Sequence, residues 1–240
     1  MGDLTLAELV TEAAQGCNIP APDTVIAATS DLDAQLFLRF ANEAGRRLVR
    51  RHPWNQLITE KTYTTVAAAL QTSAIPTDFD RMIEGTLWNR TLAERYVGPL
   101  NSQQWQAQQI EVGGSPVGYF MLRGSNLYVV PTPTAGQTAA FEYVSKYWVI
   151  SDGTGSADQT AFEDDTDTCV FDDEVMVLEL IWRWKAHKGL EYGEDFRKAE
   201  EAIEERMGSD QPMTILNMGG NRVLEGPPYD PTYPDSNWDI

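Results

Sequence analysis

The sequence predicts an α+β fold: a helical bundle built from the N- and C-terminal halves, an inserted antiparallel β-rich domain, and an extended C-terminal arm. Apolar residues recur at helical spacing near both ends of the chain, β-branched and aromatic residues gather in the middle, and prolines recur after residue 207. These changes divide the 240 residues into a first helical part, 1–56, a β-rich insertion, 57–150, an acidic connector, 151–171, a second helical part, 172–207, and the arm, 208–240.

Two helices are expected in the first part. Residues 4–14 carry apolar side chains at i, i+3 and i+4 spacing, and Gly16 follows as a stop signal. After a loop over 17–29, Ser30 is the expected N-cap of a longer helix that ends before Pro53. Near its end, where the helix dipole favours cations, lies the dense basic cluster of the chain, formed by Arg46, Arg47, Arg50 and Arg51.

The insertion contains short stretches typical of strands. A hairpin is expected around residues 123–126, because Gly, Ser and Asn suit a tight turn between two apolar runs. A short helix is expected over 100–109, which is rich in glutamine and has no β-branched residues. Strands are expected over 61–66, 81–88, 94–97, 117–122, 127–130 and 138–149.

Two further helices follow the acidic connector. The first begins near Asp172 and carries apolar residues on more than one face, so we expect it at the centre of the bundle. The second covers about 193–207 and has one acidic side. Like charges four residues apart disfavour an isolated helix, so tertiary contacts or a basic partner should compensate. The acidic side consists of Glu200, Glu201, Glu204 and Glu205.

The prolines of the last segment exclude long regular elements, yet the segment keeps apolar side chains that a solubilising tail does not need. A docking arm and a disordered tail are both open, and the arm is the favoured interpretation. Its anchors would be Ile215, Leu216, Tyr229, Tyr233 and Trp238.

The formal charge of -18 excludes some partners. A protein that grips nucleic acid or an anionic membrane needs clustered Lys and Arg, which this chain lacks over most of its length. Neither a membrane-spanning segment nor a signal peptide is expected, because no apolar run is long enough and the first residues lack a basic region. Cys17 and Cys169 are expected as free thiols, with a disulfide left open.

No catalytic constellation is apparent, and we expect neither cofactor nor metal. The acidic run 163–167 lacks the glycine of a calcium loop, which favours a solvated loop. The two histidines, His52 and His187, have no partner at ligand spacing. Asp78, Asp80 and Glu84 lie close together in sequence, but such sets of acidic residues occur by chance in an acidic chain. Among the tryptophans, the best interface candidates are Trp54 and Trp238.

Several segments together resemble the head-to-tail adaptor proteins of tailed phages. They are 78–81 (DFDR), 87–90 (LWNR), 98–100 (GPL) with 105–106 (WQ), 141–146 (FEYVSK), 180–185 (LIWRWK), 188–190 (KGL) and 194–196 (EDF). The resemblance covers about residues 4 to 207. At greater distance, the sequence is also similar to the tail tubular protein A type adaptors of short-tailed phages. The proline-rich segment beyond residue 207 departs from that pattern.

The resemblance implies a structural virion protein, made in the host bacterial cytoplasm. Such adaptors form a ring, usually dodecameric, between the portal protein and the tail tube or nozzle, around the channel through which DNA leaves. An acidic protein suits a channel wall that does not hold DNA. The helical bundle would form the subunit contacts, with the Arg46–Arg51 end pairing with Glu200–Glu205 of a neighbour, and the arm would dock on the portal or a neighbour. Carboxylates of residues 152–174 or of the β insertion would line the channel. The candidates are Asp152, Asp158, Asp164, Asp165 and Asp167.

The sequence also allows two other functions. A cell-wall hydrolase carried in the tail would use two of the clustered carboxylates. A host-carbohydrate-binding tail module would expose aromatic side chains on the β insertion.

Overall fold

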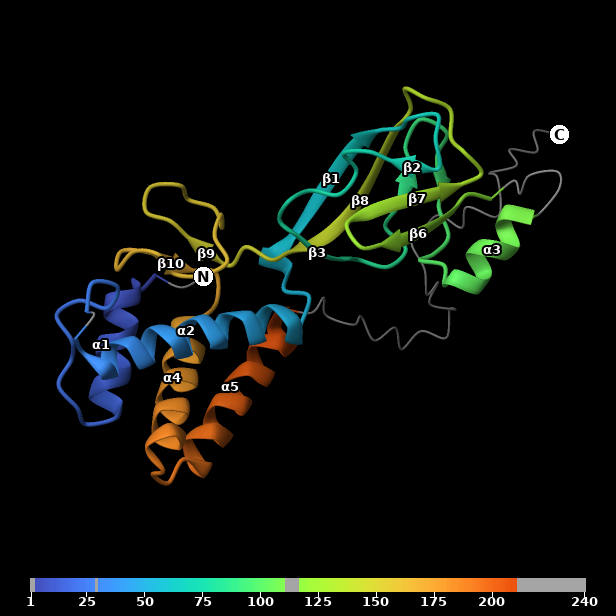
Figure 1. Cartoon of the computed structure of the whole chain (residues 1–240). Coiled ribbons are helices and arrows are strands. Elements are labelled where there is room, and N and C mark those ends of the chain that lie inside the picture. The colour runs from blue at the N-terminus through green and yellow to red at the C-terminus, as the bar shows by residue number, and fades with distance from the viewer. Residues whose placement is uncertain (1–2, 29, 111–116, 211–240) are drawn as a thin grey trace, which may run out of the picture. The chain divides into compact units, whose positions relative to one another are not determined.

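The structure is a computed structural model that describes residues 3–28, 30–110 and 117–210. They form two compact units. The helical unit comprises Met1–Ile58 and Val144–Pro212, and the β unit comprises Thr59–Tyr143 (Figure 1). The predicted α+β class is confirmed: helices from both ends of the chain pack together, and antiparallel sheets lie between them in sequence.

The first helix, α1 (Leu6–Gly16), starts two residues later than predicted because Thr5 caps it. The Thr5 hydroxyl accepts from the Glu8 backbone N–H, and the Glu8 carboxylate accepts from the Thr5 N–H at 2.9 Å. These reciprocal bonds satisfy two backbone donors that the first turn leaves unpaired. They also lower the pKa of Glu8, since they favour its charged form.

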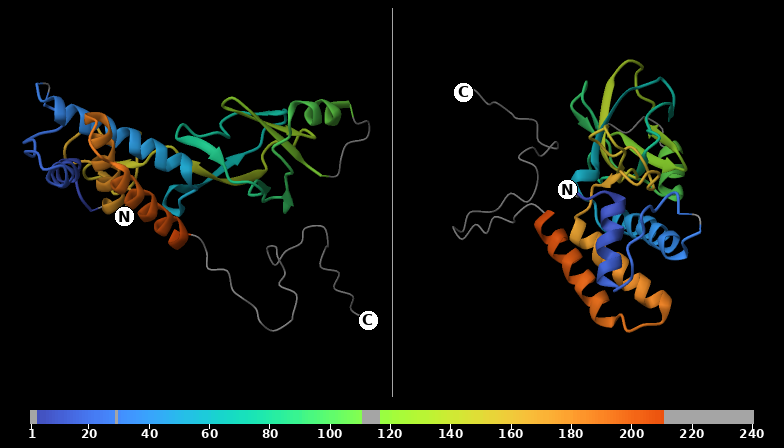
Figure 2. Two further views of the ribbon diagram at one scale, coloured as in Figure 1. Left: turned by 90° about the horizontal axis from the view of Figure 1, so that it is seen from below. Right: turned by 90° about the vertical axis from the view of Figure 1, so that its left-hand side faces the viewer.

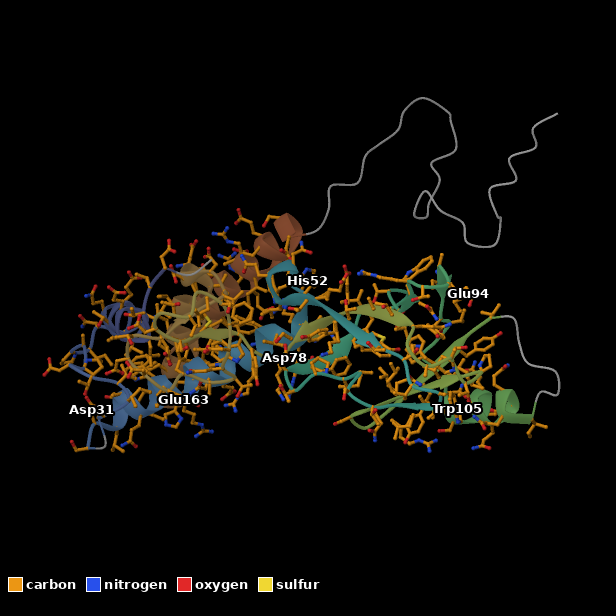
Figure 3. All side chains as sticks on the ribbon, turned by 90° about the horizontal axis from the view of Figure 1, so that it is seen from above. Asp31, His52, Asp78, Glu94, Trp105 and Glu163 are labelled. Atoms are coloured by element: carbon orange, nitrogen blue, oxygen red, sulfur yellow. The ribbon has the colours of Figure 1, made fainter. Side chains whose placement is uncertain are left out.

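The second helix, α2 (Leu32–Arg51), is capped by Asp31, and the predicted Ser30 cap is wrong by one residue (Figure 3). Asp31 Oδ1 accepts from the backbone N–H groups of Asp33 and Ala34 at 2.9 and 3.2 Å. A carboxylate at this position interacts more favourably with the positive end of the helix dipole than a hydroxyl does.

The central helix is α4 (Asp173–Lys188), which contacts α1, α2 and α5 (Gly193–Asp210), as its several apolar faces predict. Figure 2 shows these helices from two further sides. Asp172 caps the start of α4, and Gly189 ends it with φ +71°, a left-handed conformation that glycine adopts without strain. Helix α5 continues to Asp210, three residues into the predicted arm.

Residues 151–171, predicted as a connector, lie within the helical unit. There β9 (Val149–Ile150) pairs antiparallel with β10 (Thr168–Cys169). Trp148, fully buried beside β9, packs against Phe162 at a ring-centroid distance of 5.1 Å and against Phe171 at 6.0 Å. The predicted strand 138–149 is therefore two strands, because β8 (Thr138–Ser145) ends before Trp148.

The β unit contains two sheets. The larger has the order β1-β8-β4-β5 with β3 also paired to β8, and the smaller has the order β2-β7-β6. Their shared core includes Tyr63, Leu87, Phe120, Leu127 and Phe141. The strands not yet delimited are β1 (Ile58–Thr64), β2 (Leu70–Gln71), β3 (Phe79–Met82), β4 (Trp88–Asn89), β5 (Glu94–Arg95), β6 (Tyr119–Arg123) and β7 (Asn126–Val130).

The predicted hairpin is confirmed as β6–β7. Arg123 pairs with Asn126, which leaves a two-residue turn with Gly124 at φ +59°. The predicted strand 81–88 is wrong as one element, because this stretch contains parts of two separate strands, β3 and β4. The short strand β2 was not predicted. The predicted helix is confirmed as α3 (Ser102–Ile110), which buries Trp105 against Tyr128 (Figure 3).

Candidate assembly surfaces

Helix α2 has two sharply different sides. Its buried side, which includes Phe37, Ala44 and Leu48, packs inside the helical unit. Its solvent side carries residues spaced by three, four or seven positions, which places them along one narrow stripe. We call this the α2 stripe; it consists of Leu32, Arg39, Glu43, Arg46 and Arg50, all exposed. The stripe has three cations and one anion, so it is basic on a strongly acidic protein.

Arg47 and Arg51 point instead toward α5 of the same chain. Arg47 Nη2 lies 2.8 Å from Glu200 Oε1, and Arg51 Nη1 lies 2.6 Å from Glu200 Oε2. The attraction predicted between the basic and acidic clusters therefore exists within one chain for these three residues. It also compensates the like charges that surround Glu200 on its own helix.

The outer side of α5 keeps the remaining acidic residues exposed. Glu201 forms an ion pair with Arg197 of the same helix. Glu204 and Glu205 have no ion-pair partner within residues 3–28, 30–110 and 117–210. A cationic surface placed against Glu204 and Glu205 would therefore remove a like-charge repulsion without breaking an existing pair of these two residues.

A buried ion pair lies inside the helical unit. Glu179, which interrupts the apolar sequence of α4, is fully buried and pairs with Arg183, whose side chain is 5% exposed. Trp182 Nε1 donates to Glu179 Oε1 at 3.0 Å, and Arg47 Nη1 approaches Glu179 Oε2 at 3.9 Å. Burial of a charge is costly unless it is paired, so this arrangement depends on each member being present.

Large apolar side chains are exposed around the α4–α5 turn. Leu190 is 51% exposed and Tyr192 is 45% exposed. Tyr192 and Phe196 both contact the ring of Trp182, with centroid distances of 6.4 and 5.2 Å. Exposed aromatic and leucine side chains gathered in one place on a helical surface are typical of a protein–protein contact.

The carboxylates predicted to line a channel differ in what they do. Asp167 is 1% exposed and accepts from the backbone N–H groups of Glu163 and Asp164, each at 2.8 Å. Asp165 accepts from the N–H groups of Val25 and Ile26. These two carboxylates hold loops of the helical unit together, because buried N–H groups need acceptors. The burial of Asp167 removes it from the channel-lining candidates.

Three of the predicted acidic residues remain exposed, namely Asp152, Asp158 and Asp164. The hydroxyl and backbone N–H of Ser151 donate to Asp158 and lower its pKa, and Thr166 does the same for Asp164. Within the acidic run 163–167, predicted as a solvated loop, Glu163, Asp164 and Thr166 are exposed, while Asp165 and Asp167 accept backbone hydrogen bonds.

The residues considered as catalytic or metal-binding candidates lie apart from one another or form other contacts. Asp78 accepts a 2.8 Å hydrogen bond from the Tyr143 hydroxyl, while Asp80 and Glu84 border an open cavity of about 350 Å³. His52 Nε2 lies 3.3 Å from Asp210 Oδ2, and His187 packs against Phe40. In the part of the chain that the structure describes, no three His, Cys, Asp or Glu side chains gather as metal ligands.

Trp54, predicted at an interface, is 8% exposed and donates to the Leu48 carbonyl oxygen at 2.8 Å, so it belongs to the core. Both cysteines are free. Among the described residues no helix combines the length and the apolar character needed to cross a bilayer. The predicted arm anchors, Ile215, Leu216, Tyr229, Tyr233 and Trp238, lie outside the described residues.

Sequence reasoning missed parts of these surfaces. Leu32, Arg39 and Glu43 could have been found from their helical spacing with Arg46 and Arg50. The pair Glu179–Arg183 also has helical spacing, but its burial depends on three helices meeting, which spacing alone does not reveal.

A match to a protein family identifies the kind of protein that carries these surfaces. The family model described as SU10 adaptor protein matches residues 4–217, which include most of both units. The chain belongs to the SU10 adaptor protein family. No curated protein matches the chain. As a member of this family, the protein is a bacteriophage head-to-tail adaptor, a structural protein of the virion that associates with other head and tail proteins. The resemblance seen in the sequence is thereby confirmed.

The distinctive features of this adaptor are two outward surfaces of opposite charge on the helical unit and an exposed apolar turn beside one of them. In the described part of the β unit the exposed large apolar residues are aliphatic: Leu92, Val97, Ile110 and Val117.

Proposed function

We propose that the adaptor forms a closed, dodecameric ring between the portal protein and the tail tube or nozzle, and that DNA leaves the capsid through this ring. The family match over residues 4–217 carries the proposal. A ring of identical subunits requires each copy to present two different, complementary surfaces. The basic α2 stripe and the acidic outer side of α5 meet that requirement.

The charge of the protein supports a passage that does not bind DNA. At -18 per copy, a ring produces a negative field that repels phosphates and keeps DNA from adhering to the wall. The exposed carboxylates of Asp152, Asp158 and Asp164 are the candidates for the wall. A neutral or basic lumen in the assembled ring would contradict this part of the proposal.

The contact between copies would use the charges that remain free after the intrachain pairs form. Arg46 and Arg50 of one copy would face Glu204 and Glu205 of the next, beside Glu201, which already pairs with Arg197 of its own helix. Arg47, Arg51 and Glu200, which the sequence also placed at this contact, would support it from inside each copy.

Reversing two of these charges, Glu204→Lys with Glu205→Lys, should weaken ring assembly at least tenfold in subunit concentration. Both side chains are exposed and lack ion-pair partners among the described residues, so the thermal stability of the subunit should stay nearly unchanged. Sedimentation of the protein with portal-bearing capsids measures the effect.

A matched control reverses Glu94, an exposed glutamate of β5, which should not affect assembly. A second variant adds Arg46→Glu and Arg50→Glu to the two lysine substitutions. Because both charged sides are then reversed, assembly should recover. Unchanged assembly of the Glu204→Lys, Glu205→Lys protein, measured at low salt, would rule out the charged contact.

The C-terminal segment is proposed as a docking arm for the portal or a neighbouring copy, supported by its apolar anchors such as Tyr229 and Trp238. Since α5 ends at Asp210, truncation after this residue is the cleanest test. The truncated protein should fold with unchanged stability and fail to attach to portal-bearing capsids. Normal attachment would refute the docking role.

A further inference from the structure

We propose that residues 225–235 of the C-terminal arm dock as a polyproline II helix in a groove on the larger β sheet of a neighbouring copy, across the ring of Trp88. The inference rests on the proposed docking role of the arm and deepens it, because it names the surface that receives the arm and the part of the arm that binds. The occupant of the groove is thus a segment of this same protein.

The groove lies on the face of the larger sheet that is opposite to the core of the β unit. Along β8, Ala139 and Phe141 belong to that core, so Ala140 between them faces the other way. Trp88 of β4 pairs with Ala140 on one side and with Arg95 of β5 on the other, which sets these three residues in one row. The row lines an open cavity of about 760 Å³, which we call the Trp88 groove.

Trp88 is half-buried, and its indole N–H is left for a ligand. The indole Nε1 atoms of Trp54 and Trp148 donate to backbone carbonyl oxygens of their own chain. Trp88 Nε1 has no acceptor within residues 3–28, 30–110 and 117–210. A half-exposed indole offers an apolar face and one hydrogen-bond donor together, which is why tryptophan is enriched where proteins bind each other.

The arm carries the pattern that such a surface recognises. Pro228, Pro231 and Pro234 follow one another at a spacing of three residues. A polyproline II helix has three residues per turn and a rise of about 3.1 Å per residue, so these prolines form one stripe about 19 Å long. Pro227 lies outside this stripe. A segment that only keeps a protein soluble needs no such period.

The backbone of a polyproline II helix complements the free indole N–H. This helix has no internal hydrogen bonds, so its carbonyl oxygens remain open as acceptors. Proline rings that pack on Trp88 would bring one of these oxygens within reach of Nε1. Because the helix is stiff before it binds, little conformational entropy is lost on docking.

Charges on the two partners also match. Residues 225–235 carry carboxylates and no cation, and Asp230 directly precedes a proline of the stripe. Arg95 is exposed and has no ion-pair partner in the part of the chain that the structure describes. An approach of Asp230 to Arg95 would therefore pair two free charges without breaking an existing pair.

The groove has an acidic end as well. Because β4 and β8 are antiparallel, Arg90 and Glu142 lie on opposite sides of the pair formed by Trp88 and Ala140. Carboxylates accept hydrogen bonds from tyrosine hydroxyl groups, and the arm supplies two of these beside its proline stripe. They belong to Tyr229 and Tyr233.

The length of the arm allows it to reach another copy. About eighteen residues separate Asp210, where α5 ends, from Pro228, which is up to about 60 Å of extended chain. In a closed ring each copy would give one arm and receive one, so a single contact, repeated by symmetry, fills every groove.

Binding of a fluorescent peptide with the sequence of residues 224–236 to the full-length protein, followed by fluorescence anisotropy, tests the groove. Trp88→Ala should weaken binding at least tenfold. Trp88→Phe keeps an aromatic ring but lacks the N–H, and should weaken binding about fivefold. Arg95→Glu should also weaken binding about fivefold, whereas the matched control Arg123→Glu, at an exposed arginine of β6, should not. Unchanged binding to both Trp88→Phe and Arg95→Glu would overturn the proposal.

The peptide provides its own matched pair. Pro231→Ala removes a ring from the centre of the stripe and should weaken binding about fivefold, while Pro227→Ala lies outside the stripe and should change it little. Equal effects of the two substitutions would contradict the three-residue period.

Cysteine cross-linking identifies the copy that gives the arm. The variant with Arg95→Cys and Asp230→Cys should form, on mild oxidation of the protein on portal-bearing capsids, a ladder of disulfide-linked oligomers. The variant with Arg123→Cys and Asp230→Cys should form none. The native thiols should stay unreactive, because burial raises the pKa of Cys17 to about 11 and that of Cys169 to about 12.

The outcomes separate the two proposals. If the peptide does not bind, or if the pair of cysteines at 95 and 230 links only within single chains, the docking of the arm on a neighbour is wrong while the ring remains. If the unmodified protein forms no ring on portal-bearing capsids, the proposed function fails, and docking between copies of the ring fails with it.

Discussion

Replacing Glu179 with alanine is expected to destabilise the helical unit by about 3–5 kcal/mol, because it leaves the charge of Arg183 buried without its partner. The loss should exceed that of any exposed ion pair in the protein. Circular dichroism at 222 nm during urea unfolding measures it, since α1, α2, α4 and α5 all belong to the helical unit and dominate that signal.

Two further variants separate the role of the charge from that of the volume. Glu201→Ala removes an ion pair that is more than half exposed on both sides and should change stability little. Combining Glu179→Leu with Arg183→Met replaces both buried charges by apolar groups of similar size and should restore most of the stability that Glu179→Ala loses. If the Glu179→Ala protein has the same midpoint urea concentration of unfolding as the unmodified protein, the buried ion pair does not contribute to stability.

Trp148→Ala is expected to cost a similar amount, about 3–5 kcal/mol, because the ring is fully buried and its removal leaves a cavity. The indole packs on α2 at Gly45, where a Cβ atom would lie 2.3–2.4 Å from ring carbons, so the helix fits directly against the ring. The indole Nε1 also donates to the Thr160 carbonyl oxygen at 2.9 Å.

Trp148→Phe is the matched control, since it keeps most of the apolar contact and loses mainly that hydrogen bond. It should cost clearly less than Trp148→Ala. A second control is Gly208→Ala: its Cβ would have no atom within 4 Å, so this change in α5 should stabilise the helix slightly, by up to about 1 kcal/mol. Equal unfolding midpoints for Trp148→Ala and the unmodified protein would contradict the close fit of α2 against the ring.

The helices could be predicted from sequence because their signals are local. Apolar spacing located α1, α2, α4 and α5, and the apolar residues on several faces of α4 indicated its central place. The boundaries were less certain, as the cap at Asp31 rather than Ser30 shows. Both residue types cap helices well, and the choice depends on backbone geometry that the sequence does not specify.

The short strands could not be predicted in the same way. β2 and β4 have two residues each, too few for any alternation to be visible, and the strand predicted over 94–97 shortens to the two residues of β5. β2 and β4 exist because β7 and β8 offer pairing edges far away in sequence, and β5 pairs in turn with β4. The strand predicted over 138–149 was too long for the related reason that the chain leaves β8 to bury Trp148.

The sequence indicated which charged residues the assembly surfaces contain, but not which of these residues pair within the same chain. The basic cluster on α2 and the acidic side of α5 were both recognised, yet Arg47 and Arg51 pair with Glu200 in the same chain. Likewise Asp167 was grouped with exposed carboxylates, although its role is to accept backbone hydrogen bonds inside a loop. Which charges stay free depends on how the helices and loops pack, and the free ones define the surfaces available to other copies.

The central claim is that this SU10-family adaptor forms a ring on the portal through its helical unit. Electron microscopy of portal-bearing capsids, with and without the purified protein, tests it most directly. The account predicts a ring of density below the portal, with α2 of each subunit against α5 of its neighbour and exposed carboxylates toward the lumen. Capsids that bind the protein as single copies, or bind it anywhere other than the portal vertex, would contradict it.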